Sequence, residues 1–436
     1  MSMWFGCLAL LLAACAEKEP RVAVEPARLA PPEGTSVPAG SNLDAWIARS
    51  PDGSALLLEP GIYSGPVTID KPIAVWGPAD AVIETSGVGS TVSLTARGAR
   101  LLGCTVKGSG GRFDLLDSGI RVRADDVTVS GVTVREALFG ILVESCSGVT
   151  LRANRVIGKG GPALGLRGDA IRLWETTDSE VLENAVEDSR DIVVWYSSRN
   201  RVAENRVIAG RYGTHFMYSH DCLLEGNSYV GNVVGCFVMY CHGVVLCRNV
   251  LAESGGAAGM GIGMKESGDV TVEENWIVGD ATGIYVDSSP LDVDQRNRYA
   301  RNVFALCGTA VAFHSSPHRS EFADNSFRGN ECILTVGGDG DALDVRWVGN
   351  HYDAYAGYDL DSDGFGDVPF EFRRLSAQIE GKFPALALFH GAPSMQLVDA
   401  AAELMPLFSP RSLMMDRKPR MAPADPDPPP GASRAR

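Results

Sequence analysis

The sequence predicts an all-β protein whose main body is a right-handed parallel β-helix, and three observations lead to this prediction. One short phrase recurs from about residue 100: an apolar residue, two variable residues, Asn, one variable residue and an apolar residue. Alternating runs of β-branched residues lie between its copies, and Gly and Asn separate the runs. A repeat of about 22 residues with this pattern is typical of a solenoid in which each repeat forms one coil.

The asparagines give the repeat its spacing. They are Asn154, Asn184, Asn205, Asn227, Asn249, Asn275, Asn302 and Asn325, at intervals of 30, 21, 22, 22, 26, 27 and 23 residues. Asn tolerates left-handed backbone and can bond its counterpart one coil away, so we expect a column of Asn at one corner. Leucine-rich repeats also use Asn, but they need a helical half and lack the β-branched alternation.

The predicted organisation has five parts. Residues 1–15 are predicted to be a lipoprotein-type signal peptide and residues 16–40 a linker. Residues 41–350 are predicted to form the β-helix, which begins with a capping helix at 43–48. Residues 351–410 are predicted to form an acidic loop and a partly helical C-terminal extension, and residues 411–436 a disordered tail.

The N-terminus predicts export. The run "WFGCLALLLAAC" is too short to span a bilayer as a mature helix and ends in small residues before Cys15. Its end resembles a bacterial lipobox, in which Cys15 would be lipidated, although no Lys or Arg precedes the run. We therefore expect a periplasmic protein that this lipid would attach to the membrane.

Composition and charge exclude some functions. The net charge of -15 argues against nucleic-acid binding, which needs clustered Lys and Arg to neutralise phosphates. Eight cysteines remain after Cys7 and Cys15, and their spacings show neither a CxxC pair nor a zinc signature. Their disulfide connectivity stays open.

Aligning the coils on their Asn residues assigns the two faces of one strand in each coil. The residues thirteen and eleven positions before the Asn are mostly apolar, as core-facing positions should be. They are Ile171 and Leu173, Ile192 and Val194, Thr214 and Phe216, Cys236 and Val238, and Ile262 and Met264. The outward positions are then Arg172 and Trp174, Val193 and Trp195, His215 and Met217, Phe237 and Met239, and Gly263 and Lys265.

Large side chains on this outward face predict a binding surface, because contiguous exposed apolar residues mark such sites. The predicted partner-binding face includes Trp174, Trp195, Phe237 and Lys265. His215, Met217 and Met239 can converge on one small object, because coils stack about 4.8 Å apart. Thioether and imidazole form a soft ligand set suited to Cu(I), so we expect transient copper here. A covering segment of the same chain would instead make this face ordinary core.

Other residues near this face have less specific interpretations. Tyr196, Tyr218 and Tyr240 follow the Trp and Met positions, and we expect them to stack inside the coil. Cys241, beside His242, is either a soft ligand or a buried thiol.

A second metal is predicted beyond the repeats. In "DLDSDGFGD", alternating carboxylates precede a Gly as in calcium loops of the DxDxDG kind. The predicted ligands are Asp359, Asp361, Asp363 and Asp367. Position twelve is Phe370 rather than Glu, so this is an incomplete EF-hand loop, and we expect calcium in a structural role.

Four motifs carry a family resemblance. In order and register, "GRYGTHFMYSHD", "GCFVMYCHGV", "GMGIGMKESGDV" and "TGIYVDSSP" resemble the NosD family of nitrous oxide reductase maturation proteins, which are periplasmic β-helix proteins. The likeness covers residues 40–410. It implies an accessory, non-catalytic role with an ABC transporter permease and ATPase and a copper chaperone, in assembling the copper–sulfur centre of nitrous oxide reductase. Whether the cargo is copper, a sulfur species or neither stays open.

The rival function is carbohydrate binding or carbohydrate chemistry, which β-helices often perform. Such an enzyme needs converging carboxylates, but the outward Glu144 and Asp287 lie several coils apart. The "SSPH" of residues 315–318 also lacks the acidic partners of the "DPHD" motif of alginate-active β-helices. Because aromatic columns do bind sugars, a carbohydrate-binding protein remains the alternative.

Overall fold

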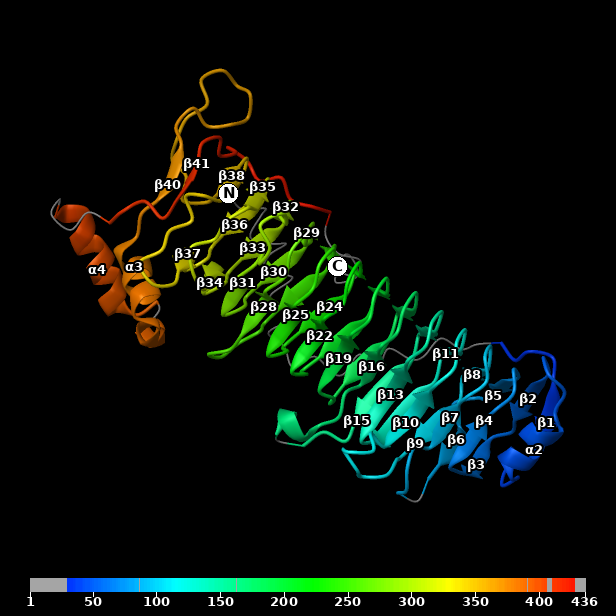
Figure 1. The fold of residues 1–436 in the computed structure, drawn as a ribbon. Helices are drawn as coiled ribbons and strands as arrows, with labels where there is room; N and C mark the ends of the chain where they lie inside the picture. The colour runs from blue at the N-terminus through cyan, green and yellow to red at the C-terminus, as the bar shows by residue number, and fades with distance from the viewer. Residues whose placement is uncertain (1–29, 86, 162, 390, 406–409, 428–436) are drawn as a thin grey trace, which may run out of the picture.

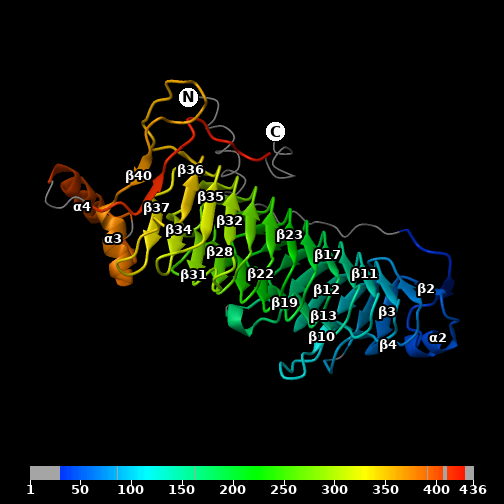
Figure 2. The same ribbon diagram turned by 45° about the horizontal axis from the view of Figure 1, so that its top comes forward.

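The computed structural model describes residues 30–427 except 86, 162, 390 and 406–409 (Figure 1). The chain forms an elongated solenoid, with one helix covering the N-terminal end and a helical group at the opposite end (Figures 1 and 2). This confirms the predicted fold. The signal peptide at 1–15 and the lipidation of Cys15 lie outside the described residues.

The described strands form three sheets of 16, 12 and 13 strands that run along the solenoid, and from β2 to β39 every third strand belongs to the same sheet. The sixteen-strand sheet contains β1 (Thr35–Val37), β2 (Ala55–Leu58), β5 (Ala74–Trp76), β8 (Arg100–Leu102), β11 (Thr128–Ser130), β14 (Thr150–Arg152), β17 (Glu180–Leu182), β20 (Arg201–Ala203), β23 (Leu223–Glu225), β26 (Val245–Cys247), β29 (Thr271–Glu273), β32 (Asn297–Ala300), β35 (Ser320–Ala323), β38 (Arg346–Val348), β41 (Met414–Asp416) and β40 (Phe370–Phe372).

The other two sheets are parallel throughout. The twelve-strand sheet contains β4 (Val67–Ile69), β7 (Val92–Leu94), β10 (Ser118–Val122), β13 (Phe139–Glu144), β16 (Ile171–Trp174), β19 (Asp191–Trp195), β22 (Tyr212–Met217), β25 (Val234–Met239), β28 (Met260–Lys265), β31 (Thr282–Asp287), β34 (Thr309–Phe313) and β37 (Cys332–Val336). The thirteen-strand sheet contains β3 (Gly61–Ser64), β6 (Ala81–Glu84), β9 (Thr105–Lys107), β12 (Thr133–Ala137), β15 (Arg155–Gly158), β18 (Ala185–Glu187), β21 (Arg206–Ile208), β24 (Ser228–Val230), β27 (Val250–Ala252), β30 (Trp276–Val278), β33 (Val303–Ala305), β36 (Ser326–Arg328) and β39 (His351–Tyr352).

The helices are short and lie mainly at the ends of the solenoid. They are α2 (Leu43–Arg49), α3 (Leu375–Lys382), α4 (Pro393–Leu404) and the 3₁₀ helices η1 (Leu164–Leu166) and η2 (Pro384–Phe389). The Asn42 side chain caps α2 by accepting a hydrogen bond from the Ala45 N–H, which stabilises the predicted capping helix. Among the described residues, no helix has the length and apolar character needed to span a membrane.

The predicted asparagine column is a continuous hydrogen-bonded ladder. The Asn227 Oδ1 accepts from both the backbone N–H and the side-chain Nδ2 of Asn205, at 2.9 and 3.0 Å. Asn227 Nδ2 donates to the Val202 carbonyl and to Asn249 Oδ1, each at 2.9 Å. The left-handed conformation falls on the residue before the Asn, for example Gly226, and not on the Asn. Asn is therefore selected for its side-chain hydrogen bonds, not for its backbone freedom.

The C-terminal segment differs from the prediction of a disordered tail. Residues 410–427 return to the solenoid, and β41 joins the sixteen-strand sheet. Asp416 is buried, and its Oδ2 accepts from the N–H and the Nδ2 of Asn350, which ends the ladder. An unpaired amide would be costly at this buried position, and the carboxylate supplies its acceptor. The solenoid also starts earlier than expected, because β1 lies within the predicted linker.

Candidate functional site

Five neighbouring strands of the twelve-strand sheet carry the candidate site. Their register pairs Trp174 with Trp195, Trp195 with Met217, Met217 with Met239, and Met239 with Lys265. The side chains predicted to face inwards on these strands are fully buried, whereas the four aromatic and thioether side chains of this row are partly exposed. The predicted outward direction therefore agrees with the exposure of these four side chains, whereas Val193 and His215, also predicted to face outward, are buried. We call Trp174, Trp195, Met217 and Met239 the Trp–Met column.

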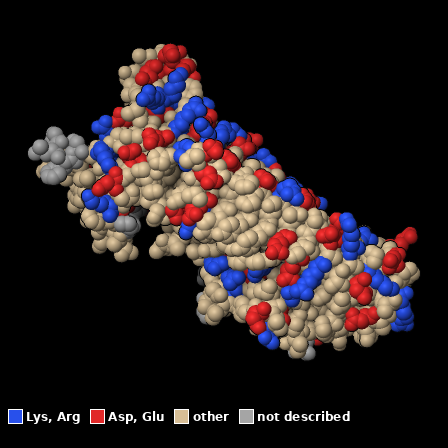
Figure 3. Space-filling model, viewed as in Figure 1, with Lys and Arg blue, Asp and Glu red and all other residues tan. Residues whose placement is uncertain are grey.

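The surface near the middle of the solenoid, where β22 and β25 lie, is short of charge. Figure 3 shows an area without Lys, Arg, Asp or Glu over the middle of the solenoid, with charged residues on either side. It coincides with the labels β22 and β25 of Figure 1. A partly exposed apolar strip on an otherwise charged surface is suited to binding.

His215 lies beside the column and is enclosed by its neighbours. Only 6% of the residue is exposed, and its ring packs against Tyr212 at 5.0 Å and Phe237 at 6.1 Å between centroids. The Trp195 indole Nε1–H donates to His215 Nδ1 at 3.2 Å, and His215 Nε2 lies 3.3 Å from Met239 Sδ. The structure therefore brings an imidazole nitrogen and a thioether sulfur into contact.

Burial controls the charge of this imidazole. Desolvation, with added repulsion from Arg211 and Arg190, lowers the pKa of His215 to about 3. The ring is therefore neutral at ordinary pH.

A buried charge cluster supports one end of the column. Asp169 and Asp191 are fully buried, and Arg190 and Arg211 pair with them, with Arg190 Nη2 2.7 Å from Asp169 Oδ1. Burial raises the pKa of Asp169 to about 6; the Asp191 charge adds to this, and Arg190 opposes it. Arg172 lies 3.8 Å from Asp169 Oδ2, so it too is anchored.

Arg172 also orders the two indoles. Its guanidinium carbon lies 4.8 Å from the Trp174 ring centroid and 5.0 Å from that of Trp195. The two rings meet edge to face at 6.1 Å. Cation–π contacts of this kind restrict both indoles.

The tyrosine column was wrongly placed by the sequence analysis. Tyr196, Tyr218 and Tyr240 stack with centroids 5.2 and 4.8 Å apart, but the first two are 46% and 43% exposed. All three have left-handed backbone, with φ of 51°, 49° and 56°. This corner conformation interrupts the alternation of the strand and turns the rings outwards. The stack lies beside the Trp–Met column, because Trp174 contacts Tyr196 at 5.0 Å.

Cys241 is a buried thiol, one of the two possibilities left open by the sequence. Its Sγ donates to the Met239 carbonyl at 3.0 Å and accepts from the Ser219 N–H at 3.4 Å. Burial raises its pKa to about 12, so it offers no thiolate. All eight cysteines within the described residues are buried and free.

The histidines of the following turn form a pair on the surface. His220 and His242 stack with centroids 4.0 Å apart, and His220 Nδ1 accepts from the His242 backbone N–H at 3.2 Å. The sequence showed both residues but not this contact.

Three of the four predicted calcium ligands converge. One carboxylate oxygen from each of Asp359, Asp361 and Asp363 lies within 4.8 Å of the others. Asp367 instead accepts from the Leu360 N–H at 2.7 Å. Lys418 Nζ is 3.9 Å from Asp363 Oδ2, so the C-terminal segment approaches this loop. The calcium site stays a prediction.

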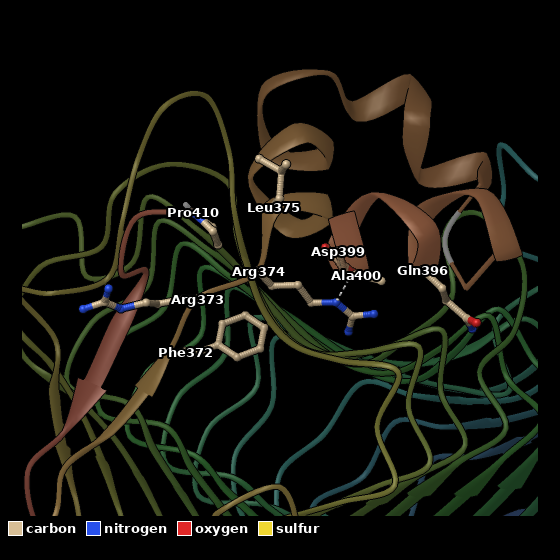
Figure 4. A pocket seen from close by; sticks show the side chains of 8 residues that line it. All are labelled: Phe372, Arg373, Arg374, Leu375, Gln396, Asp399, Ala400 and Pro410. Carbon is tan, nitrogen blue, oxygen red and sulfur yellow. Dashed lines mark hydrogen bonds and ion pairs between the residues drawn. The ribbon is translucent and has the colours of Figure 1, made fainter. Parts of the chain in front are cut away.

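A cavity of about 350 Å³ lies away from the column, at the C-terminal end (Figure 4). Its lining residues are Phe372, Arg373, Arg374, Leu375, Gln396, Asp399, Ala400 and Pro410. An ion pair of 2.8 Å between Arg374 Nε and Asp399 Oδ2 crosses it and fastens α4 to the segment before α3. The cavity therefore belongs to helix packing.

Comparison with known proteins finds similarity to one family. Residues 158–357 match the family described as "Periplasmic copper-binding protein (NosD)". Two relatives, from Pseudomonas aeruginosa and Stutzerimonas stutzeri, are each named "Probable ABC transporter binding protein NosD". They are 25% and 24% identical over 367 and 376 residues, which cover 78% and 80% of this chain and 82% and 83% of theirs.

Two solved structures with a similar fold have TM-scores below 0.5. The A-module of the Azotobacter vinelandii mannuronan C-5 epimerase AlgE6 is 15% identical with a TM-score of 0.48, covering 70% of this chain and 92% of that one. The Streptococcus pneumoniae surface adhesin PfbA is 12% identical with a TM-score of 0.48, covering 76% and 97%. Neither bears on function. The family match contains the whole Trp–Met column and both relatives span most of the chain, so this protein is similar to NosD proteins over most of its length.

Proposed function

We propose that this chain is a periplasmic accessory protein that holds Cu(I) transiently during maturation of the copper–sulfur centre of nitrous oxide reductase. It would act with an ABC transporter and a copper chaperone. The description of its family and the names of its relatives support the copper and transporter parts. The single observation that carries the proposal is the contact between His215 Nε2 and Met239 Sδ on the outer face of the solenoid.

The donors suit a soft monovalent ion. Thioether sulfur and neutral imidazole favour Cu(I), whereas a hard ion such as calcium prefers oxygen. Met217 pairs in register with Met239 and is partly exposed, so a third donor lies at the solvent side. Partial exposure suits cargo that must be received and released.

The C-terminal helices supply a surface for the transporter. Large apolar side chains there are exposed: Phe383, Leu388, Phe389, Leu397, Leu404 and Met405. Leu397 and Leu404 are 70% and 83% exposed on one helix, α4. Asp399 holds this helix in place through Ser376 as well as Arg374, with the Ser376 hydroxyl donating at 2.7 Å. A rigid helix with an exposed apolar face fits a hydrophobic groove of a permease.

The carbohydrate alternative has less support. A sugar stacks on an open ring face, but Arg172 lies over both indoles and the tyrosines cover one another. Burial would raise the pKa of Glu144, but hydrogen bonds from Arg121 and Arg123 outweigh it and hold that pKa below its usual value. Six strand steps separate β13 from β31, about 29 Å at 4.8 Å per step, so Glu144 and Asp287 are too far apart for a glycosidase pair. We therefore propose a non-catalytic role.

The copper part is tested by replacing Met217 and Met239 together with Ala. Loss of two of three donors should weaken Cu(I) binding at least tenfold, measured by competition with a Cu(I) chelator, and should reduce the copper content of nitrous oxide reductase in the host. Met421→Ala is the matched control, because Met421 is also exposed, at 40%, but lies in the C-terminal segment. Unchanged copper binding and unchanged reductase maturation in the double variant would refute the proposal.

The transporter part is tested by point variants and not by truncation, because removing the C-terminus would also remove Asp416 from the ladder. Leu397→Asp with Leu404→Asp should abolish co-purification with the permease while the solenoid stays folded. Leu360→Asp, at an 80% exposed position on the acidic loop, is the control. Co-purification of the Leu397/Leu404 variant at the level of the parent protein would exclude α4 as the docking site.

A further inference from the structure

The hydrogen bonds of His215 determine which of its nitrogens carries the proton. An indole N–H can only donate, so His215 Nδ1, which lies 3.2 Å from Trp195 Nε1, must be an unprotonated acceptor. A neutral imidazole has one ring proton, and it is therefore on Nε2. That hydrogen points at Met239 Sδ, 3.3 Å away, as a weak donor to a thioether.

This tautomer is unsuited to metal binding. A metal ion needs the lone pair of a ring nitrogen, and the available lone pair is on Nδ1, which Trp195 occupies. Nε2 lies beside the thioether but carries the hydrogen. The same hydrogen bond excludes the doubly protonated ring, because a proton on Nδ1 would point at the indole N–H.

We propose that Trp195 is a gate on the copper site: its indole N–H holds His215 in the tautomer that cannot bind a metal through Nε2. Cu(I) enters between His215 and Met239 after the N–H of Trp195 has turned away. The ring proton then moves from Nε2 to Nδ1, so the protein neither gains nor loses a proton. This inference rests on the proposed copper site, and Trp195 is a positioning residue that touches no metal.

The position of Trp195 allows an outside signal to open the gate. It is partly exposed within the predicted partner-binding face, and it packs against the Arg172 guanidinium on one side. A protein that docks on this face and offers an oxygen acceptor to the indole N–H would release His215 Nδ1. Partner docking and acceptance of Cu(I) are coupled in this way, which keeps the site closed to copper in the absence of the donor or receiver.

The variant Trp195→Phe tests the gate, because it keeps an aromatic ring and removes the N–H. A lost hydrogen bond corresponds to a change of about twofold to tenfold in an equilibrium, so Cu(I) affinity of the full chain should rise by about that factor. Trp276→Phe is the control for the same change elsewhere: Trp276 lies on β30 in the thirteen-strand sheet, outside the copper site and the partner-binding face. Its Cu(I) affinity should equal that of the parent protein. Thermal unfolding checks that both variants are folded.

A second measurement does not depend on copper. Nitrogen-15 NMR of the imidazoles, with His215 assigned through His215→Gln, should show the Nε2–H form in the metal-free parent and a larger Nδ1–H fraction in Trp195→Phe. An Nδ1–H form in the metal-free parent overturns the gate. So does a Trp195→Phe affinity equal to the parent while the Met217/Met239 variant still loses Cu(I), a result that leaves the copper site standing. Cu(I) binding that ignores Met217 and Met239 instead removes the site itself.

Discussion

Two corners of the same coil carry columns of repeated side chains, and the columns differ in what they bond to. At the asparagine corner, each buried amide bonds the backbone and side chain of its neighbours in the adjoining coils. At the tyrosine corner, three partly exposed rings stack on one another with left-handed backbone that disfavours bulky residues. The fold needs the first column. We expect the fold to depend less on the second column, because its rings are partly exposed.

The largest effect should come from breaking the buried column. Asn227→Ala removes hydrogen bonds to Asn205, Asn249 and the Val202 carbonyl, and leaves buried polar groups without partners. Each such group costs about 1–3 kcal/mol, so the free energy of unfolding should fall by about 3 kcal/mol or more, measured by urea denaturation. A loss below about 0.5 kcal/mol, typical of a surface substitution, would mean that the ladder does not stabilise the coil.

An intermediate effect on stability is expected at Asp280, whose carboxyl group occupies a position that Asn holds in other coils. Asp280 Oδ1 accepts from the Ser254 N–H, as Asn232 Oδ1 does from Gly210 and Asn330 Oδ1 from Cys307. Asp280 Oδ2 is buried without a hydrogen-bond partner, and burial raises the pKa of Asp280 well above its usual value. Asp280→Asn can donate as its two counterparts do, and should stabilise the protein at pH 7 by about 1–3 kcal/mol.

The pH dependence of Asp280 has a definite sign. Its pKa is higher in the folded than in the unfolded chain, so its contribution is fully present below about pH 4, the unfolded value, and is lost as the pH rises towards the folded pKa. The advantage of Asp280→Asn in thermal unfolding should therefore grow from pH 4 upwards. The exposed Asp292→Asn is the control, and a pH-independent difference between parent and Asp280→Asn would contradict this assignment.

The smallest effect on stability should come from the exposed column. Tyr218→Gly removes the stacking with Tyr196 and Tyr240, which should destabilise the protein by about 1 kcal/mol. It also relieves a left-handed backbone at φ 49°, which should stabilise the protein by about 1 kcal/mol. The free energy of unfolding should change by less than about 1 kcal/mol, while co-purification with soluble partner proteins should fall severalfold. A destabilisation as large as that of Asn227→Ala would show that this column, too, serves the fold.

Local pattern predicted much of the molecule. The spacing of the asparagines located the coils, and the alternation along β16 to β28 assigned inward and outward side chains, because a strand alternates faces strictly. Alternation failed at Tyr196, Tyr218 and Tyr240, where left-handed backbone follows the strand. A signal was present: tyrosine recurs three times at coil spacing directly after the Trp–Met column.

The sequence by itself determined the coil repeat, the asparagine corner and the outward direction of the Trp–Met column, since these follow from short-range periodicity and backbone geometry. Only the tertiary structure decided that Trp195 bonds His215, that Asp416 ends the ladder and that the Cys241 thiol is buried and bonded to the Ser219 N–H. These contacts join residues from different coils or from the far end of the chain. Their partners are chosen by three-dimensional packing and the need to satisfy buried polar groups, which no local pattern encodes.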